Sequence, residues 1–207
     1  NGDKILASSA VYLKSNNRLA QNTVVATTMS NLGFEQYLIK NDIKLIRTDV
    51  GDRYVAQTMS DKNLTLGGEQ SGHIIYSEFG FTGDGIIAAL QILAYFVDTE
   101  VSTISELCNN YEEMPQKIFN IKYNDTNIFS KKQLTELTNK FQKKLGADGR
   151  ISIRKSGTEP VIRVMIEYKS QEKIEDIFSE VDKELKSLES KMSNTTSIND
   201  RQYKQVA

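Results

Sequence analysis

Cysteine, histidine, tryptophan and proline are nearly missing from this sequence. Its 207 residues include one cysteine, one histidine, two prolines and no tryptophan. The single cysteine, Cys108, excludes an internal disulfide and favours a reducing compartment, and the single histidine excludes a zinc site made of histidine and cysteine clusters. Acidic and basic side chains almost cancel, at a net charge of −1, so no overall field favours binding to nucleic acid or to an anionic membrane.

Long apolar runs and targeting signals are also missing. No stretch approaches the roughly 20 apolar residues that span a bilayer, and the N-terminus lacks the pattern of a signal peptide. We therefore predict a cytoplasmic protein with no membrane partner and no nucleic-acid partner. The chain begins at Asn1 and not at a methionine, which predicts that it is a piece of a longer protein.

The first half of the chain alternates predicted helices with short β-branched strands. Apolar spacing predicts helices, with Ser30 and Asp52 as the expected N-caps of two of them, and β-branched runs predict strands. The last helix of this half is almost entirely apolar, so we predict that it is buried. This order predicts an α/β domain over residues 1–112, with a mixed sheet flanked by helices. The predicted helices are 3–14, 30–41, 52–60 and 86–98, and the predicted strands are 23–27, 44–48 and 65–66.

The character of the sequence changes after Cys108. The polar, aperiodic segment that follows predicts a domain boundary with a hinge near residues 110–117. The pattern strand, helix, strand, strand, helix then predicts a smaller α+β domain over residues 113–192, an antiparallel sheet with its helices on one face. We expect the last helix to end near Lys191 and residues 193–207 to form a disordered tail.

A cationic segment between two predicted strands is the first candidate site. Positive charge from Arg154, Lys155 and Arg163 combines with hydroxyl donors and with a glycine that lets the backbone approach a ligand. A phosphate group needs all three features. The alternative is a solvated surface turn whose hydroxyls bond their own backbone. The candidate phosphate-binding residues are Arg154, Ser156, Gly157, Thr158 and Arg163.

A glycine-bracketed turn over residues 67–73 is the second candidate site. Glu69 can accept hydrogen bonds from two neighbouring sugar hydroxyls, and Ser71 can donate or accept one. His73, the only imidazole, lies in the same turn. The alternatives are that Glu69 binds only the local backbone and that His73 is a structural histidine. Together the two segments predict a ligand with a phosphate at one end and hydroxyls in the middle.

These two segments resemble the sugar-binding and phosphate-binding loops of the α-D-phosphohexomutases. The motifs are Gly-Glu-Gln-Ser-Gly-His at 68–73 and Arg-Lys-Ser-Gly-Thr-Glu-Pro-Val-Ile-Arg at 154–163. Residues 29–33 (Met-Ser-Asn-Leu-Gly) and 48–55 (Thr-Asp-Val-Gly-Asp-Arg-Tyr-Val) narrow the resemblance to the bacterial phosphoglucosamine mutases. The resemblance covers nearly all of residues 1–192, and it assigns this chain to the third and fourth of the family's four domains.

The resemblance implies a reaction and identifies what this chain does not contain. It implies interconversion of glucosamine 6-phosphate and glucosamine 1-phosphate through a phosphoserine and a bisphosphorylated sugar, for UDP-N-acetylglucosamine and cell-wall synthesis. The catalytic serine loop and the Mg²⁺-binding loop of the family are not in this sequence, so we assign no catalytic nucleophile and no metal ligand here. His73 is a candidate proton shuttle, and Asp52 and Arg53 are candidates for facing the cleft. The implied partners are the missing N-terminal domains 1 and 2, and the resemblance is compatible with a homodimer of the full-length form.

Two other functions are compatible with the same residues. One is a phosphomannomutase or phosphoglucomutase of the same fold, because nothing in the chemistry of these side chains recognises the 2-amino group of glucosamine. The other is a non-catalytic module that binds a sugar phosphate by itself. We expect the isolated chain to be inactive if it is part of a mutase.

Overall fold

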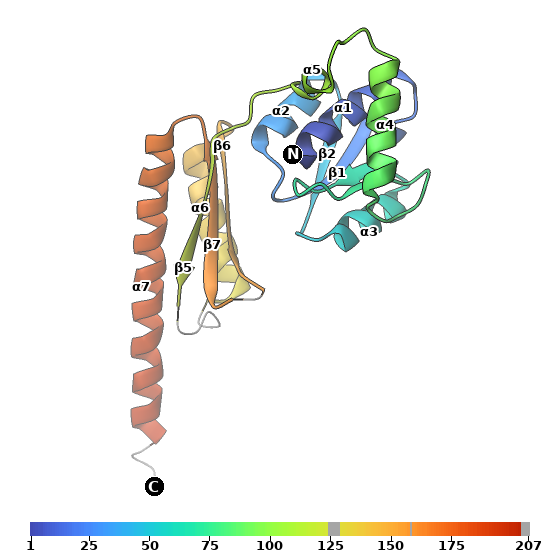
Figure 1. Ribbon diagram of the computed structural model, residues 1–207. Helices are drawn as coiled ribbons and strands as arrows, with labels where there is room; N and C mark the ends of the chain where they lie inside the picture. The colour runs from blue at the N-terminus through green and yellow to red at the C-terminus, as the bar shows by residue number, and fades with distance from the viewer. Residues whose placement is uncertain (124–128, 158, 204–207) are drawn as a thin grey trace. The chain divides into compact units, whose positions relative to one another are not determined.

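The computed structural model describes residues 1–123, 129–157 and 159–203, with side chains described as far as residue 190 (Figure 1). The chain divides into two compact units, Asn1–Met114 and Pro115–Ala207. Each unit has its own hydrophobic core. Among the described residues, no helix combines the length and the apolar character needed to cross a bilayer.

The first unit is built on a sheet with the strand order β2-β1-β3-β4. Strand β1 pairs in parallel with both β2 and β3, and β4 pairs antiparallel with β3. The central strand β1 is buried along its whole length, as its β-branched sequence predicts. The strands are β1 (Thr23–Thr27), β2 (Lys44–Thr48), β3 (Leu66–Gly68) and β4 (Ile74–Tyr76).

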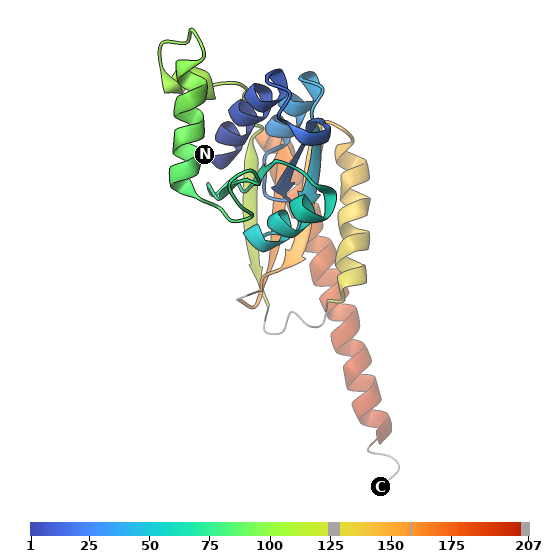
Figure 2. The same cartoon turned by 90° about the vertical axis from the view of Figure 1, so that its right-hand side faces the viewer.

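Helices cover both faces of this sheet. Helices α1 and α2 pack on one face, around Leu6, Phe34 and Leu38, and α3 packs on the other, through Val55 and Met59 (Figures 1 and 2). The predicted α/β architecture with a mixed sheet is therefore confirmed. The helices of this unit are α1 (Gly2–Ser15), the 3₁₀ helix η1 (Ala20–Asn22), α2 (Leu32–Lys40), α3 (Asp52–Lys62), α4 (Gly85–Val97) and α5 (Ile104–Cys108).

Two helix starts differ from the sequence prediction. The N-cap of α2 is Asn31, whose side chain accepts a hydrogen bond from the Gly33 backbone N–H at 2.8 Å, and not Ser30. The N-cap of α3 is Gly51, at φ 131°, so Asp52 is the first helical residue and not the cap. Both differences shift a boundary by one residue and leave the element in place.

Helix α4 contradicts the prediction that it is buried. Ile86, Leu90, Leu93 and Val97 are 75%, 58%, 45% and 79% exposed, and the side chains of α4 that are buried among the described residues are those of Ala88 and Ile92. The helix lies at the periphery of the unit and packs through one narrow side, although its sequence is apolar on all sides. The apolar composition of α4 predicted that the whole helix is buried, but composition alone does not say whether the chain contains an element that covers the side facing away from the sheet.

The second unit has an antiparallel sheet with the strand order β5-β7-β6. One face of this sheet carries Ile153, Ile162 and Val164, which pack in a single core with Phe141 of α6 and Ile174 of α7. The predicted α+β domain with its helices on one face is confirmed. Its elements are β5 (Gln116–Lys122), α6 (Lys131–Leu145), β6 (Gly149–Lys155), β7 (Val161–Tyr168) and α7 (Gln171–Tyr203).

Helix α7 continues beyond its predicted end. It extends from Gln171 to Tyr203, so the predicted end near Lys191 and the predicted disordered tail are wrong for residues 193–203. The sequence after Ser170 contains neither glycine nor proline, so no residue in it terminates a helix by its backbone chemistry. Residues 204–207, which the tail prediction also covers, lie outside the described residues.

Candidate functional site

The carboxyl ends of β1, β2 and β3 lie next to one another at one edge of the first sheet, because these three strands are parallel neighbours. A hollow of about 440 Å³ lies at this edge. Open α/β sheets bind their ligands at the carboxyl ends of their strands, where the chain leaves the sheet. The hollow is lined by Asn1, Thr27, Met29, Val50, Glu69, Gln70 and Ser71.

The predicted sugar turn is the tip of the β3–β4 hairpin. The Glu69 backbone N–H donates to the His73 carbonyl at 2.9 Å, and the Gly72 N–H donates to the Glu69 carbonyl at 3.0 Å. Gly72 has φ 105°, a conformation that glycine adopts without strain. The backbone therefore closes a tight turn that projects the polar side chains of residues 69–73 from the end of the strands.

Glu69, Ser71 and His73 are brought together, as predicted from their positions in one turn. The Glu69 side chain is 12% exposed, and its Oε1 accepts from the Gly51 backbone N–H at 3.1 Å. Its Oε2 lies 3.7 Å from His73 Nδ1, and Ser71 Oγ lies 3.1 Å from the same nitrogen. One carboxylate oxygen of Glu69 is thus fixed by the backbone of the loop after β2, while the residue also lines the hollow.

Several residues that line the hollow were not among the predicted site residues. Thr27 ends β1, and Met29 and Val50 follow β1 and β2. Their positions at the ends of neighbouring parallel strands were the signal that could have identified them. Asn1 and Gln70 complete this set.

Asp52 and Arg53 do not line the hollow with Glu69. They contribute to a separate depression beside α3, which they share with Gln57, Ile75 and Phe81 among others. Arg53 also donates to the hydroxyl of its neighbour Tyr54 at 2.8 Å. The structure therefore places these two residues outside the sugar hollow.

In the second unit, Arg154 and Arg163 lie directly opposite each other on neighbouring strands. The register of β6 and β7 pairs these two residues. Their neighbours Ile153 and Val164 belong to the core under the helices, so the alternation of a strand places both arginines on the other face of the sheet. Like charges in directly opposite positions repel each other, and an anion bound between them would remove that repulsion.

Arg163 has a carboxylate partner in the turn. Its Nη2 lies 2.9 Å from Glu159 Oε2, and the two side chains are 35% and 59% exposed. An ion pair this exposed contributes about 0–1 kcal/mol, so a phosphate dianion can displace the carboxylate. The Arg163 Nε atom is buried and has no hydrogen-bond partner among the described residues. The guanidinium therefore keeps unused donor capacity.

The other predicted phosphate-binding residues occupy the end of the hairpin. Arg154 and Lys155 belong to β6 itself, and not to the turn as the sequence predicted. The Ser156 N–H donates to the Val161 carbonyl at 2.9 Å, which extends the strand pairing by one more hydrogen bond. A Cβ added to Gly157 would meet no other atom within 4 Å, so the space beside it is open. Thr158 lies outside the described residues.

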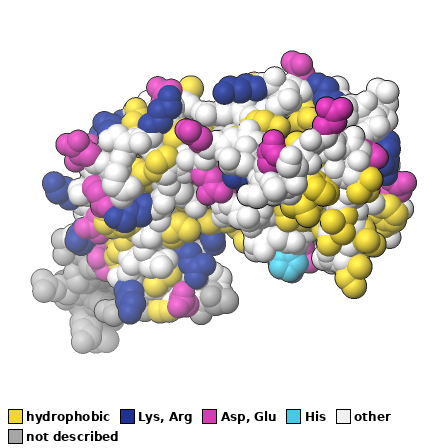
Figure 3. All heavy atoms as spheres, turned by 45° about the horizontal axis from the view of Figure 1, so that its top comes forward, with side chains coloured by type: hydrophobic (Ala, Val, Ile, Leu, Met, Phe, Trp, Pro, Cys, Tyr) yellow, Lys and Arg dark blue, Asp and Glu magenta, His cyan; other side chains and the backbone are white. Residues whose placement is uncertain are grey.

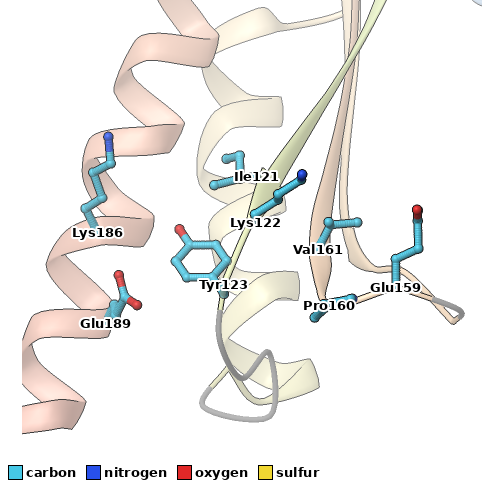
Figure 4. Close-up of a pocket in the computed structure, with 8 residues that line it drawn as sticks. All are labelled: Ile121, Lys122, Tyr123, Glu159, Pro160, Val161, Lys186 and Glu189. Atoms are coloured by element: carbon cyan, nitrogen blue, oxygen red, sulfur yellow. The ribbon is translucent and has the colours of Figure 1, made fainter.

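The second unit has a hollow beside the same turn, between the end of β5 and α7 (Figure 4). It measures about 560 Å³ and is lined in part by Tyr123, Glu159 and Lys186. Burial, reinforced by the charges of Glu189 and Asp182, raises the pKa of the Tyr123 hydroxyl to about 12. Neither Arg154 nor Arg163 lines this hollow, so it is distinct from the predicted phosphate site.

No cluster of three or more histidine, cysteine, aspartate or glutamate side chains suited to a metal ion occurs among the described residues.

Two family models match consecutive parts of this chain. Residues 1–114 match the alpha/beta/alpha domain III of phosphoglucomutase/phosphomannomutase, and residues 113–184 match the C-terminal domain of the same proteins. The chain belongs to the phosphoglucomutase/phosphomannomutase family. It contains the parts of the family protein that are called domain III and the C-terminal domain.

Curated relatives of this family member are phosphoglucosamine mutases. The chain is 43% identical to that of Bartonella quintana over 180 residues, which cover 87% of this chain and 39% of the relative. It is 46% identical to that of Clostridium botulinum strain 657 over 180 residues, 86% of this chain and 40% of the relative. The chain thus spans about two fifths of the length of the relatives it matches.

Solved structures show the same fold at lower identity. The N-acetylphosphoglucosamine mutase of Aspergillus fumigatus superposes with a TM-score of 0.70 at 18% identity, over 91% of this chain and 43% of that one. An N-acetylglucosamine-phosphate mutase in its substrate complex superposes with a TM-score of 0.69 at 20% identity, over 89% of this chain and 44% of that one. At these identities the likeness supports the phosphohexomutase fold.

Proposed function

We propose that this chain is the sugar-phosphate-binding part of a phosphoglucosamine mutase. The proposed reaction interconverts glucosamine 6-phosphate and glucosamine 1-phosphate through a phosphoserine enzyme and a bisphosphorylated sugar, on the route to UDP-N-acetylglucosamine. The observation that carries the proposal is the facing pair of Arg154 and Arg163 on β6 and β7. The identity of 43–46% to phosphoglucosamine mutases over most of the chain supports the choice of reaction.

In this proposal the phosphate that is not reacting is held by the second unit. Arg154 and Arg163 supply charge, and Ser156, Gly157 and Thr158 supply hydroxyl and backbone donors. Arg163 exchanges its exposed bond with Glu159 for bonds to phosphate oxygens. Binding energy from a phosphate remote from the reacting oxygen lowers the barrier by orienting the sugar.

The sugar ring is held by the hairpin tip of the first unit. Glu69 Oε2 accepts hydrogen bonds from sugar hydroxyls and Ser71 Oγ donates or accepts one, while the Gly51 N–H, by donating to Glu69 Oε1, keeps Glu69 in place. The same contacts serve the sugar in either orientation, as an intermediate that turns around requires. His73 is proposed as a proton shuttle because its ring lies beside both side chains and is 59% exposed.

The serine nucleophile and the Mg²⁺ ligands are proposed to lie in N-terminal domains 1 and 2 of the whole protein. The apolar stripe of α4, formed by Ile86, Leu90, Leu93 and Val97, supports a partner of that kind. Hydrophobic side chains gather on part of the molecular surface (Figure 3), and patches of this kind mark surfaces that another protein part covers. The isolated chain is accordingly proposed to be inactive.

Binding of glucosamine 6-phosphate to the chain and to its Arg163→Gln variant, measured by titration calorimetry, tests the proposal. We expect millimolar affinity at best for the isolated chain, equivalent to about 4 kcal/mol. The variant should bind about 10- to 150-fold more weakly, because loss of one charge-assisted bond removes about 1.5–3 kcal/mol. Lys143→Gln, at an exposed position of α6, is the matched control for a lost positive charge, and we expect this variant to bind the sugar phosphate like the parent.

Two results of this titration would oppose the proposal. Equal affinity of the parent and of Arg163→Gln would show that β7 does not bind the phosphate. Micromolar affinity of the isolated chain would favour the alternative of a self-standing, non-catalytic sugar-phosphate-binding module.

A phosphomannomutase or phosphoglucomutase is the second candidate activity, because the matching family models carry both names. The carboxylate of Glu69 can accept from a hydroxyl or from an amino group, so its chemistry alone does not distinguish the three sugar phosphates. Turnover of the three sugar phosphates by the full-length protein separates these activities, and a preference for a mannose or glucose phosphate would overturn the glucosamine assignment.

A further inference from the structure

Met114, the last residue of the first unit, is held on both of its backbone polar groups by one side chain. The Met114 N–H donates to Asn31 Oδ1 at 2.8 Å, and Asn31 Nδ2 donates to the Met114 carbonyl at 2.9 Å. The side-chain amide thus pairs with this residue as a neighbouring strand would. Because both the N–H and the C=O are fixed, the φ and ψ angles of Met114 are fixed as well.

Asn31 is itself fixed in a buried position. It is 2% exposed, and its backbone N–H donates to Oδ2 of Asp3, which has no exposed surface, at 2.8 Å. The chain before Met114 packs closely against Gly33: a Cβ at this glycine would overlap the carbonyl oxygen of Glu112. The end of the first unit is therefore tied to the start of α1 and to the loop after β1.

The start of α1 also holds the sugar turn. The Gly2 N–H donates to the Gln70 carbonyl at 2.9 Å, and a Cβ on Gly2 would overlap the carbonyl oxygen of Glu69. Gly2 and Asp3 are adjacent in sequence. The sugar turn and the Asn31 contact to Met114 are thus anchored on the same turn of helix.

The first residue of the second unit is fixed on its own side. The Pro115 carbonyl accepts from the Tyr168 N–H at 3.1 Å, which attaches it to the end of β7. The proline ring fixes φ of this residue near −65°. The Met114 carbonyl and the Pro115 carbonyl are both held by hydrogen bonds, and the ring fixes φ of Pro115. The backbone dihedral angle that stays free to rotate between these two carbonyls is ψ of Pro115.

We propose that Asn31, oriented by Asp3, is a positioning residue that anchors the connection between the two units and confines rotation between them to Pro115. The anchor keeps the connection in register with the sugar turn, which contributes to capture of a sugar phosphate by both units. Only this last consequence rests on the proposed function. The anchor itself is a property of the chain.

The test measures the distance between the two units by pulsed electron paramagnetic resonance on the whole chain. Spin labels are attached at Lys62→Cys in α3 and Lys143→Cys in α6, both exposed, in a Cys108→Ser background. Asn31→Ser keeps an N-cap for α2 but is too short to reach both polar groups of Met114. We expect a broader distance distribution for Asn31→Ser than for the parent.

Ser9→Ala is the matched control, because it removes a different buried hydrogen bond of the first unit, the one between Ser9 Oγ and the Tyr76 hydroxyl at 2.7 Å. We expect this variant to keep the parent distribution. If Asn31→Ser does not fold, Asn31→Asp replaces it, since it retains the shape and the acceptor but loses the donor to the Met114 carbonyl. An unchanged width in the Asn31 variant, or equal broadening in Ser9→Ala, would overturn the proposal.

Phosphate binding separates this proposal from the proposed function. The Asn31 variant should bind inorganic phosphate with the affinity of the parent, since Arg154 and Arg163 belong to the second unit. Failure of Arg163→Gln to weaken phosphate binding would oppose the proposed function and leave the distance measurement unaffected. A loss of phosphate affinity in the Asn31 variant would show that its effect extends beyond the connection and would count against a positioning role.

Discussion

The Asp3 carboxylate lies fully buried at the start of α1, where it supports the loop after β1. Burial raises the pKa of this carboxyl above its ordinary value of 3.8, and the Asn31 hydrogen bond and the charge of Arg47 oppose the shift only in part. A raised pKa means that the folded state binds the proton more tightly than the unfolded state does. The contribution of Asp3 to stability is therefore present in full below pH 3.8 and is lost as the pH rises through the folded-state pKa.

Asp3→Asn should remove this pH dependence. The amide oxygen still accepts from the Asn31 N–H, but the residue no longer titrates. We expect the stability of Asp3→Asn relative to the parent to be highest at pH 7 and to decline as the pH falls toward 3.8. Urea unfolding of both proteins across that range measures the difference, and a difference that does not vary with pH would contradict the raised pKa.

Residues close in sequence were predictable at the candidate site, and residues joined by the fold were not. Glu69, Ser71 and His73 share one turn, so their proximity followed from their spacing alone. Thr27, at the end of β1, and Val50, in the loop after β2, reach the same hollow because these two strands run in parallel. The grouping of residues 154–163 was visible as charge, but its geometry depends on strand register.

At the scale of the element, most helices and strands followed from apolar periodicity and β-branched runs. Strands β1 and β2 match their predicted ranges, 23–27 and 44–48. Helix α4 was predicted correctly as a helix and wrongly as buried. Apolar periodicity identifies the buried face of a helix only when the opposite face is polar, and α4 has apolar residues on both faces. The end of α7 was missed because a polar sequence without glycine or proline does not specify where a helix stops.

Two substitutions in α4 test its exposed stripe. Leu90 is 58% exposed and Ile92 is 7% exposed, and both are truncated to alanine. We expect Leu90→Ala to change the unfolding free energy by less than about 0.5 kcal/mol, and Ile92→Ala to reduce it by about 2–5 kcal/mol. Denaturant unfolding of the isolated chain measures both changes.

The same pair reports on the proposed covering of α4 by further domains. In the full-length protein, Leu90→Ala should become destabilising, because the side chain would then lose contacts with the covering domain. A neutral Leu90→Ala in both contexts would show that the stripe stays exposed, and the partner proposed for it would be wrong.

At the scale of the whole molecule, the chain has two separate cores joined at Met114 and Pro115. Two cores predict two unfolding transitions, because each core can unfold while the other stays folded. Phe141 of α6 is 1% exposed, and Phe141→Ala should destabilise the second unit by about 3–5 kcal/mol. The unfolding temperature of the first unit should not change. Scanning calorimetry measures this, and an equal shift of all the heat absorption would indicate a single cooperative unit.

The arginines of β6 and β7 owe their proximity to the alignment of two strands, and not to the peptide between them. A synthetic loop copied from residues 154–163 would carry every donor yet leave its two guanidinium groups free to drift apart. Likewise, one amino acid inserted before Arg154 would turn that side chain toward the helices and dismantle the anion site, although no residue of the motif had been replaced. Transplanting this chemistry into another protein therefore requires moving the whole hairpin.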